Sequence, residues 1–173
     1  MSPHDLGRGA LIDGRYKIVA KLGTGGSGVV YEVEHARTGR RLAMKVLAPK
    51  LAESRDVVRR LIREGAAISK LHSPNTVQVF DYGMTNGLAY IVMELVRGET
   101  LSKSLRENGP IAPERAMKLV LDVCASLREA HEKGIVHRDI KPDNVMIVRD
   151  ARGEEAAKVV DFGLAKVFYA DGV

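Results

Sequence analysis

The stretch that most constrains this chain is residues 137–163, which reads H-R-D-I-K-P-D-N, then a short apolar run, and then D-F-G. Four of its side chains supply two acids, a base and an amide: Asp139, Asp161, Lys141 and Asn144. Phosphoryl transfer needs such a set, because one carboxylate takes the hydroxyl proton while an amide and a second carboxylate hold Mg2+. We therefore expect Asp139 to act as the base, and Asn144 and Asp161 to bind the metal through hard oxygen atoms.

A glycine-rich turn near the N-terminus joins two segments with strand-like alternation. Gly23, Gly25 and Gly28 fit the pattern G-x-G-x-x-G, which dinucleotide-binding folds also use. In those folds the glycines open a helix, whereas here they lead into V-V-Y-E-V, which is rich in β-branched and aromatic residues. The turn is thus expected to cap a hairpin whose bare backbone can approach phosphate groups closely. A purely structural hairpin is the alternative for this motif taken alone.

A lysine and a glutamate are predicted to pair inside the protein. Lys45 lies in the apolar run L-A-M-K-V-L and shares a strand face with apolar neighbours, so we expect it to be buried and to need a partner. Residues 54–71 have the apolar spacing of a helix, and Glu64 falls on its inward stripe. The alternatives are a lysine that points outward from an edge strand and a glutamate that pairs with Arg60 at the surface.

The remaining pattern predicts strands first and helices afterwards. The expected elements are strands at 76–82 and 88–96, helices at 100–107 and 113–133, and a hairpin of 145–148 with 158–160. Pro113 suits the first turn of the longer helix, and Gly134 ends it. The predicted apolar stripe of this helix is Ala116, Leu119, Val120, Val123, Leu127 and Ala130. The hairpin would return Asp161 towards Asn144.

Together these motifs resemble those of a eukaryotic-type Ser/Thr protein kinase, of the kind also found in bacteria. The resemblance runs from about Arg15 to Ala165 and then stops, within the activation segment. It implies an α+β, two-lobed fold, with a complete N-lobe (a five-stranded antiparallel sheet plus one helix) and a partial, mainly helical C-lobe. The expected organisation is a flexible leader at 1–14, the N-lobe and hinge at 15–96, and the partial C-lobe at 97–173.

The resemblance also implies ATP and Mg2+ as cofactors and a Ser/Thr protein as substrate. In the family, the lysine at position 45 grips the α- and β-phosphates and pairs with the helix glutamate, and a lysine at 141 marks Ser/Thr specificity. The implied catalytic residues are Asp139, Lys141, Lys45 and Glu64. The implied nucleotide-binding residues are Gly23, Gly25, Gly28, Val30, Ala43, Lys45, Met93, Glu94, Val96 and Met146.

Within that set, the backbone of 94–96 resembles the hinge that reads the adenine edge, and Met93 has the gatekeeper position. Val30, Ala43 and Met146 could sandwich the base, although core residues would look the same in sequence.

Two aromatic residues beside the acids are expected to be structural. His137 and Phe162, with Ile68 and Val79, resemble the stack that aligns the two lobes of the family. A catalytic histidine is the alternative for His137, but Asp139 already fills the role of base.

Two features depart from the family pattern. Ser27 stands at the tip of the glycine-rich turn, where the family often has an aromatic residue, so we expect a more mobile lid without loss of function. After Asp161 there is no A-P-E motif, and Tyr169 is the only hydroxyl-bearing residue. In the family, Arg138 pairs with a phosphorylated residue of that segment, and the usual Ser/Thr phosphosite is missing from this sequence.

Composition excludes several other classes of protein. The net charge is +5, but Lys and Arg alternate with Asp and Glu and no nucleic-acid motif is present, so we expect no nucleic-acid partner. No apolar run is long enough to span a membrane, and a cytoplasmic location is expected. Cys124 is the only cysteine, which excludes an internal disulfide, and its place in the 113–133 pattern predicts a buried thiol.

Two functions from different classes remain. The first is a Ser/Thr protein kinase that transfers the ATP γ-phosphate to protein hydroxyls in the full-length form, which the intact chemical positions favour. The second is a truncated, non-catalytic fragment that binds nucleotide or a partner, which the missing substrate-docking region favours. A small-molecule phosphotransferase is a distant third. Because the apolar stripe of 113–133 would normally face a helix that this sequence lacks, we also expect marginal stability or self-association.

Overall fold

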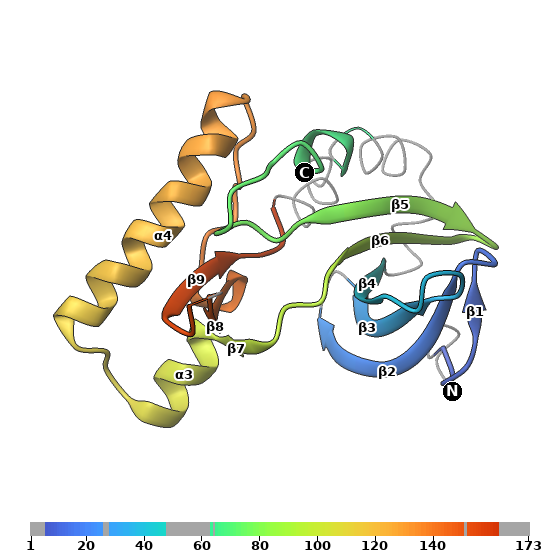
Figure 1. The fold of residues 1–173 in the computed structure, drawn as a ribbon, viewed down its shortest axis with the longest axis horizontal. Coiled ribbons are helices and arrows are strands. Elements are labelled where there is room, and N and C mark those ends of the chain that lie inside the picture. Colours follow the sequence, from blue (N-terminus) through green and yellow to red (C-terminus); the bar gives the residue numbers. More distant parts are fainter. Residues whose placement is uncertain (1–5, 26–27, 48–62, 64, 151, 163–173) are drawn as a thin grey trace, which may run out of the picture. The chain divides into compact units, whose positions relative to one another are not determined.

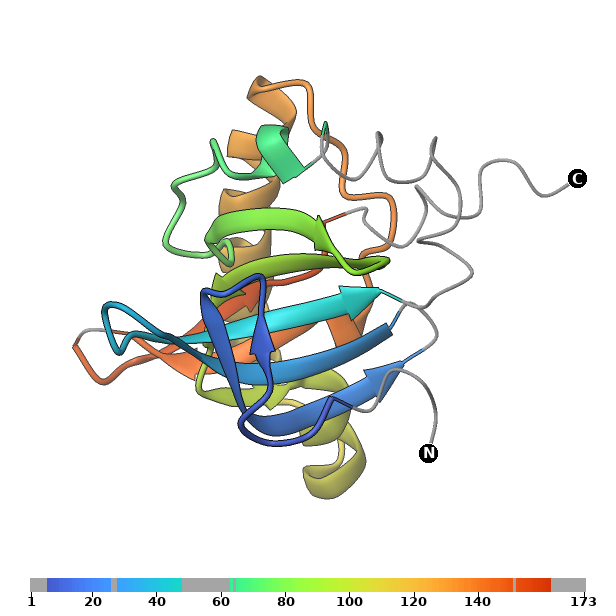
Figure 2. The ribbon, with the colours of Figure 1, turned by 90° about the vertical axis from the view of Figure 1, so that its right-hand side faces the viewer.

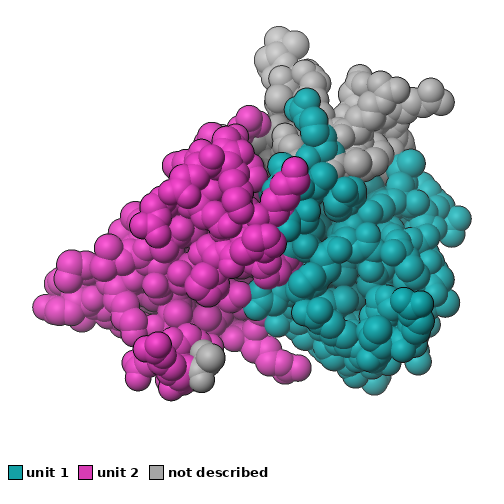
Figure 3. Space-filling view, turned by 45° about the horizontal axis from the view of Figure 1, so that its top comes forward, with its two compact units in different colours: residues 1–69, 79–95 teal, residues 70–78, 96–173 magenta. Residues whose placement is uncertain are grey.

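The computed structural model describes residues 6–25, 28–47, 63, 65–150 and 152–162. The chain divides into two compact units, the first made of residues 1–69 with 79–95 and the second of residues 70–78 with 96–173 (Figure 3). The sequence placed 70–78 in the N-lobe, whereas these residues group with the second unit.

The first unit is built on an antiparallel sheet with strand order β1-β2-β3-β4-β6-β5 (Figures 1 and 2). Its strands are β1 (Leu11–Ile12), β2 (Tyr16–Gly25), β3 (Gly28–His35), β4 (Arg41–Leu47), β5 (Val79–Thr85) and β6 (Leu88–Glu94).

The five predicted strands are all present, although β5 begins at residue 79 rather than 76. Strand β1 is a sixth strand that the sequence analysis did not predict. Of the predicted helix at 54–71, residue 63 and residues 65–68 are helical, and most of the rest lies outside the described residues.

Residues 6–14 are not the loose leader that the sequence suggested. Leu11 and Ile12 pair with the start of β2, and Ile12 is only 5% exposed. Asp13 and Gly14 between the strands have φ of 51° and 64°. The N–H of Arg15 donates to the carbonyl of Ile12 at 3.0 Å and closes a turn with Asp13 and Gly14 at its centre. Positive φ at both central residues is what a type I′ turn requires, and Asp-Gly is a preferred pair for it. The signal was therefore present in the sequence, between two short apolar segments.

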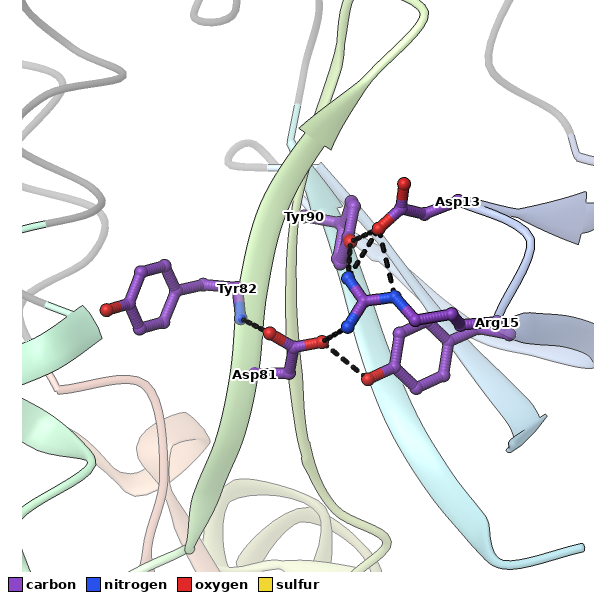
Figure 4. A network of polar contacts seen from close by, with 6 residues as sticks. Asp13, Arg15, Asp81, Tyr82 and Tyr90 are labelled. Carbon is purple, nitrogen blue, oxygen red and sulfur yellow. Dashed lines mark hydrogen bonds and ion pairs between the residues drawn. The ribbon is translucent and has the colours of Figure 1, made fainter. Parts of the chain in front are cut away.

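The sheet curls so that its first strands reach its last ones. The rings of Tyr16 on β2 and Tyr90 on β6 have centroids 6.1 Å apart, although the two strands are not neighbours in the sheet. Arg15 donates to Asp81 of β5 at 2.7 Å and to the Tyr90 hydroxyl at 2.9 Å (Figure 4). The curl encloses one apolar cluster: Ile12, Tyr16, Ile18, Tyr31, Val33, Leu42, Met44, Val46, Tyr90 and Val92.

The second unit combines helices with a three-stranded sheet of order β7-β8-β9. Its elements are β7 (Gly98–Thr100), α3 (Leu101–Asn108), α4 (Pro113–Glu132), the 3-10 turn η1 (Pro142–Asn144), β8 (Val145–Arg149) and β9 (Glu155–Val159). The predicted hairpin and both predicted helices are confirmed. The hydroxyl of Thr100 caps α3 by accepting from the backbone N–H of Lys103 at 3.1 Å.

The buried face of α4 differs from the predicted stripe. Leu119, Ser126 and Ala130 are buried, and the hydroxyls of Ser126 and Thr76 form a 2.7 Å hydrogen bond. A serine can occupy this face because its hydroxyl has a partner, which sequence periodicity does not reveal. Val120, which belongs to the predicted stripe, is 58% exposed, and Cys124 is exposed rather than buried.

A carboxylate anchors the segment before β5 to α4. The Glu129 carboxylate accepts backbone hydrogen bonds from His72 at 2.9 Å and from Ser73 at 2.7 Å, and Lys133 donates to it at 2.6 Å. Partial burial opposes ionisation, but these hydrogen bonds outweigh it and lower the pKa of Glu129 to about 2. The loop is also joined to β9, because Val77 and Val159 form a 3.0 Å backbone bond.

In the part of the chain that the structure describes, none of the helices combines the length and the apolarity needed to cross a bilayer.

Candidate active site

The glycines of the first unit serve two different purposes. A Cβ atom on Gly28 would lie 2.1 Å from the carbonyl oxygen of Val46, and its φ is +143°, so the close pairing of β3 with β4 requires glycine. Gly23 and Gly25 have no atom within 4 Å of the position of a Cβ. Both residues pair with β3, but the side on which a Cβ would project is open, as a turn that receives a phosphate group would need.

Lys45 is buried in the middle of the sheet. It is 3% exposed and lies on β4, which is paired on both sides by β3 and β6. The alternative of an outward lysine on an edge strand is therefore wrong. The proposed partner, Glu64, lies outside the described residues.

The register gathers four of the predicted nucleotide-binding side chains on one sheet face. Val30 pairs with Lys45, and Ala43 pairs with Met93, and direct cross-strand partners share a face. This face is opposite to the one that carries Met44 and the apolar cluster, so both faces of β4 are buried. Glu94 ends β6 opposite Leu42.

The remaining predicted nucleotide-binding residues belong to the second unit. Val96 precedes β7, and Met146 on β8 pairs with Thr100 of β7. Both side chains are half-buried.

In the second unit, three predicted residues meet at one carboxylate. Asp139 Oδ2 accepts a hydrogen bond from Lys141 Nζ at 2.9 Å and another from Asn144 Nδ2 at 3.1 Å. Asn144 Nδ2 also donates to the backbone oxygen of Asp139 at 2.8 Å, and η1 holds Asn144 in place through its N–H to the carbonyl of Lys141. The hydrogen bond to Asp139 raises the pKa of Lys141, which therefore stays a cation.

His137 is structural, as predicted. Its ring packs on Phe162 with centroids 4.6 Å apart, and it is 1% exposed. The N–H of Asp139 donates to Nδ1 at 3.3 Å, so Nε2 carries the proton and donates to the carbonyl of Val160 at 2.9 Å. Burial lowers the pKa of His137. A neutral ring with both nitrogens engaged has no atom left for proton transfer.

Two residues at this site have a backbone conformation that the sequence did not signal. Arg138 and Asp161 have φ of 65° and 57°, in the left-handed region. That region disfavours residues with a Cβ, and such residues cluster at functional sites. Arginine gives no local signal for this region, and aspartate tolerates it more readily than most residues, but no turn motif at Asp161 pointed to it.

The donor set fits Mg2+. Because the Nδ2 atom of Asn144 faces Asp139, its Oδ1 atom remains as a possible metal ligand. The N–H of Val160 donates to the Asn144 carbonyl at 3.0 Å, which brings the residue before Asp161 next to Asn144. Within the described ranges no group of three or more His, Cys, Asp or Glu residues could hold a metal. An amide and one carboxylate suit Mg2+, which usually completes its shell with water and substrate phosphates.

Comparison with known proteins identifies the family. The family model for the protein kinase domain matches residues 16–172, and the chain therefore belongs to the protein kinase family. It is 40% identical over 161 residues to the serine/threonine-protein kinase pkn2 of Myxococcus xanthus, covering 93% of this chain and 19% of that protein. It is also 40% identical over 157 residues to the serine/threonine-protein kinase PrkC of Bacillus subtilis, covering 91% of this chain and 24% of that protein.

A solved structure gives the same result for the fold. The crystal structure of the Mycobacterium tuberculosis PknI kinase domain matches with a TM-score of 0.82 and 30% identity, covering 92% of this chain and 63% of that one. The predicted resemblance and the predicted kinase-like fold are thereby confirmed. The chain spans about a quarter or less of the curated relatives described above, at 19% and 24% of their length.

Proposed function

We propose that this chain forms the nucleotide-binding and catalytic part of a Ser/Thr protein kinase, which transfers the γ-phosphate of ATP to a hydroxyl group of a protein. The observation that carries the proposal is the Asp139 carboxylate, held by Lys141 at 2.9 Å and by Asn144 at 3.1 Å in a member of the protein kinase family. Both contacts orient a carboxylate that would accept the proton of the substrate hydroxyl.

The neighbouring residues have complementary tasks in this proposal. Lys141 would neutralise charge on the γ-phosphate, and its raised pKa keeps it protonated. Asn144 and Asp161 would hold Mg2+, which supplies charge neutralisation at the phosphate oxygens when it is bound.

The first unit would bind the rest of the nucleotide. The glycine-rich turn, with free space beside Gly23 and Gly25, would cover the phosphates. Lys45 would contact the α- and β-phosphates with Glu64 as its partner. The apolar side chains for the adenine would be Val30, Ala43, Met93 and Met146. The backbone of residues 94–96 would read the adenine edge.

A melt of this chain with and without Mg-ATP tests nucleotide binding. Ligand at 100 times its dissociation constant adds about 2.7 kcal/mol to stability, which moves the midpoint by several degrees. We expect a shift that Lys45→Met abolishes. A cooperative melt with no shift would contradict nucleotide binding. Transfer is tested with the longer protein and a serine or threonine peptide, where Asp139→Asn must silence the incorporation of phosphate.

The second candidate, a fragment that associates through its surface, has support of its own. Met117, Val120 and Leu121 on α4 are 62%, 58% and 64% exposed, and they share one helix face with Cys124. We propose that this face causes self-association of the 173-residue chain. Light scattering at high concentration should then detect oligomers that Leu121→Glu disperses. A wild-type monomer without dye-binding apolar surface would refute this proposal.

We propose the cytoplasm, where Mg-ATP is available, as the place of action. A role in signalling by phosphorylation of proteins follows from the proposed transfer.

A further inference from the structure

A tight contact joins Gly65, in the helical turn at 65–68, to the ring of Tyr82 on β5. A Cβ atom on Gly65 would lie 3.1 Å from Cδ1 and 3.2 Å from Cγ of Tyr82, whereas ordinary contacts measure 3.4–4 Å. The ring therefore rests directly on the helix backbone. Glycine weakens a helix more than any residue except proline. Close approach of the ring is the physical reason for glycine here.

The backbone that carries the ring is held firmly. The N–H of Tyr82 donates to Asp81 Oδ1 at 2.9 Å. Asp81 Oδ2 accepts from Arg15 at 2.7 Å and from the Tyr16 hydroxyl at 2.6 Å. Figure 4 shows the Tyr82 ring and the Asp81 carboxylate on opposite sides of β5. Tyr82 also pairs with Ile91 of β6. The backbone position from which the ring projects is thus well fixed.

Tyr82 lies in the same cross-strand row as Lys45. Tyr82 pairs with Ile91, and Ile91 pairs with Lys45, so the three residues lie side by side on β5, β6 and β4. Direct cross-strand partners share a sheet face. The side chains of Tyr82 and Lys45 therefore project from the same face, and their Cα atoms are about 10 Å apart at the strand spacing.

We propose that Tyr82 is a positioning residue for the phosphate-binding lysine. Its ring fixes the position of the helical turn at 65–68 above the sheet, and Gly65 admits the ring. Ile68, 4% exposed, holds the same turn in the core. The inference rests on the proposed function, in which Lys45 binds ATP and the helix supplies Glu64, the residue just before Gly65. A methyl group on Gly65 would separate the helix from the ring and change the surroundings of Lys45.

Four variants of the 173-residue chain test this proposal: Gly65→Ala, Tyr82→Ala, the double variant, and Gly7→Ala as a matched control. Gly7 has no atom within 4 Å of a built Cβ. Two readouts are compared with the melting midpoint. They are the Mg-ATP dissociation constant by calorimetry and the labelling rate of Lys45 by an amine-reactive reagent, measured by mass spectrometry without nucleotide.

We expect Gly65→Ala to weaken Mg-ATP binding and to accelerate Lys45 labelling, each about fivefold, with Gly7→Ala unchanged. Tyr82→Ala should produce both effects as well, because it removes the support itself, and the double variant should resemble Tyr82→Ala rather than add the two losses. A purely structural contact would lower the midpoint and leave both readouts unchanged, and that result would overturn the proposal.

Failure of the proposed function gives a different result. If the wild-type chain does not bind Mg-ATP, the proposed function fails. The labelling rates of Lys45 then test the positioning role of Tyr82 by themselves. Faster labelling in both Gly65→Ala and Tyr82→Ala, with no further acceleration in the double variant, would support the positioning role. Unchanged labelling would overturn it.

Discussion

Replacing Glu129 with glutamine should loosen the second unit. The carboxylate accepts hydrogen bonds from the backbone of His72 and Ser73 and from Lys133. Glutamine has the same shape but puts an NH2 group where one acceptor was, so one N–H donor loses its partner and the charge attraction disappears. Hydrogen bonds to charged groups are among the stronger ones in proteins.

The magnitude follows from the pKa. A fall from 4.5 to about 2 corresponds to ~3 kcal/mol at 1.36 kcal/mol per pH unit. The side chain is 21% exposed, and solvent screening reduces this to about 1–2 kcal/mol. Because the folded-state pKa lies below the unfolded one, this contribution is complete above pH 4.5 and disappears as the pH falls towards 2.

Urea unfolding followed by circular dichroism measures this effect, since the chain contains no tryptophan. We expect Glu129→Gln to lower the free energy of unfolding by about 1–2 kcal/mol at pH 7. The difference from wild type should vanish near pH 2. Glu132→Gln, an exposed position on the same helix, is the matched control. Equal stability of Glu129→Gln and wild type at pH 7, or a difference that persists at pH 2, would refute this account of the anchor.

Three further predictions concern other parts of the structure. Gly28→Ala should destabilise the first unit by more than about 1 kcal/mol, because its Cβ would meet the Val46 carbonyl at 2.1 Å; a urea midpoint equal to that of Gly25→Ala would contradict this. Ser126→Ala and Thr76→Val should each cost about 1–3 kcal/mol by leaving a buried hydroxyl unpaired, and the double variant should cost less than the sum; additive losses would count against the pair. The imidazole of His137 should stay neutral below pH 6.5, since burial lowers its pKa, and an NMR midpoint at or above 6.5 would disprove the burial argument.

The sequence predicted the strands and the polar cluster of residues 139–144 because these depend on local pattern. Asp139, Lys141 and Asn144 meet as their spacing implied, and the alternation around Lys45 correctly indicated burial. Contacts between residues only a few positions apart are determined by the local course of the chain, so the spacing in the sequence predicts them.

The errors came from contacts between distant residues. The periodicity of 113–133 placed Val120 and Cys124 inside, yet the buried face includes Ser126, whose partner Thr76 lies 50 positions earlier. A helix pattern gives the width of an apolar stripe but not the identity of a polar partner. The contact between Gly65 and Tyr82 has the same character, because no local rule relates a helix glycine to a tyrosine on a later strand.

The Asp13–Gly14 hairpin places the N-terminal boundary of the folded unit before the residues that match the family model. The family match begins at residue 16, but the first unit extends further towards the N-terminus. A protein trimmed to the match would lose Ile12 from the core and would also lose the hydrogen bond that Arg15 donates to Asp81. Laboratories that express this domain should therefore retain the residues before the match, since the edge of a sequence family and the edge of a stable fold differ here.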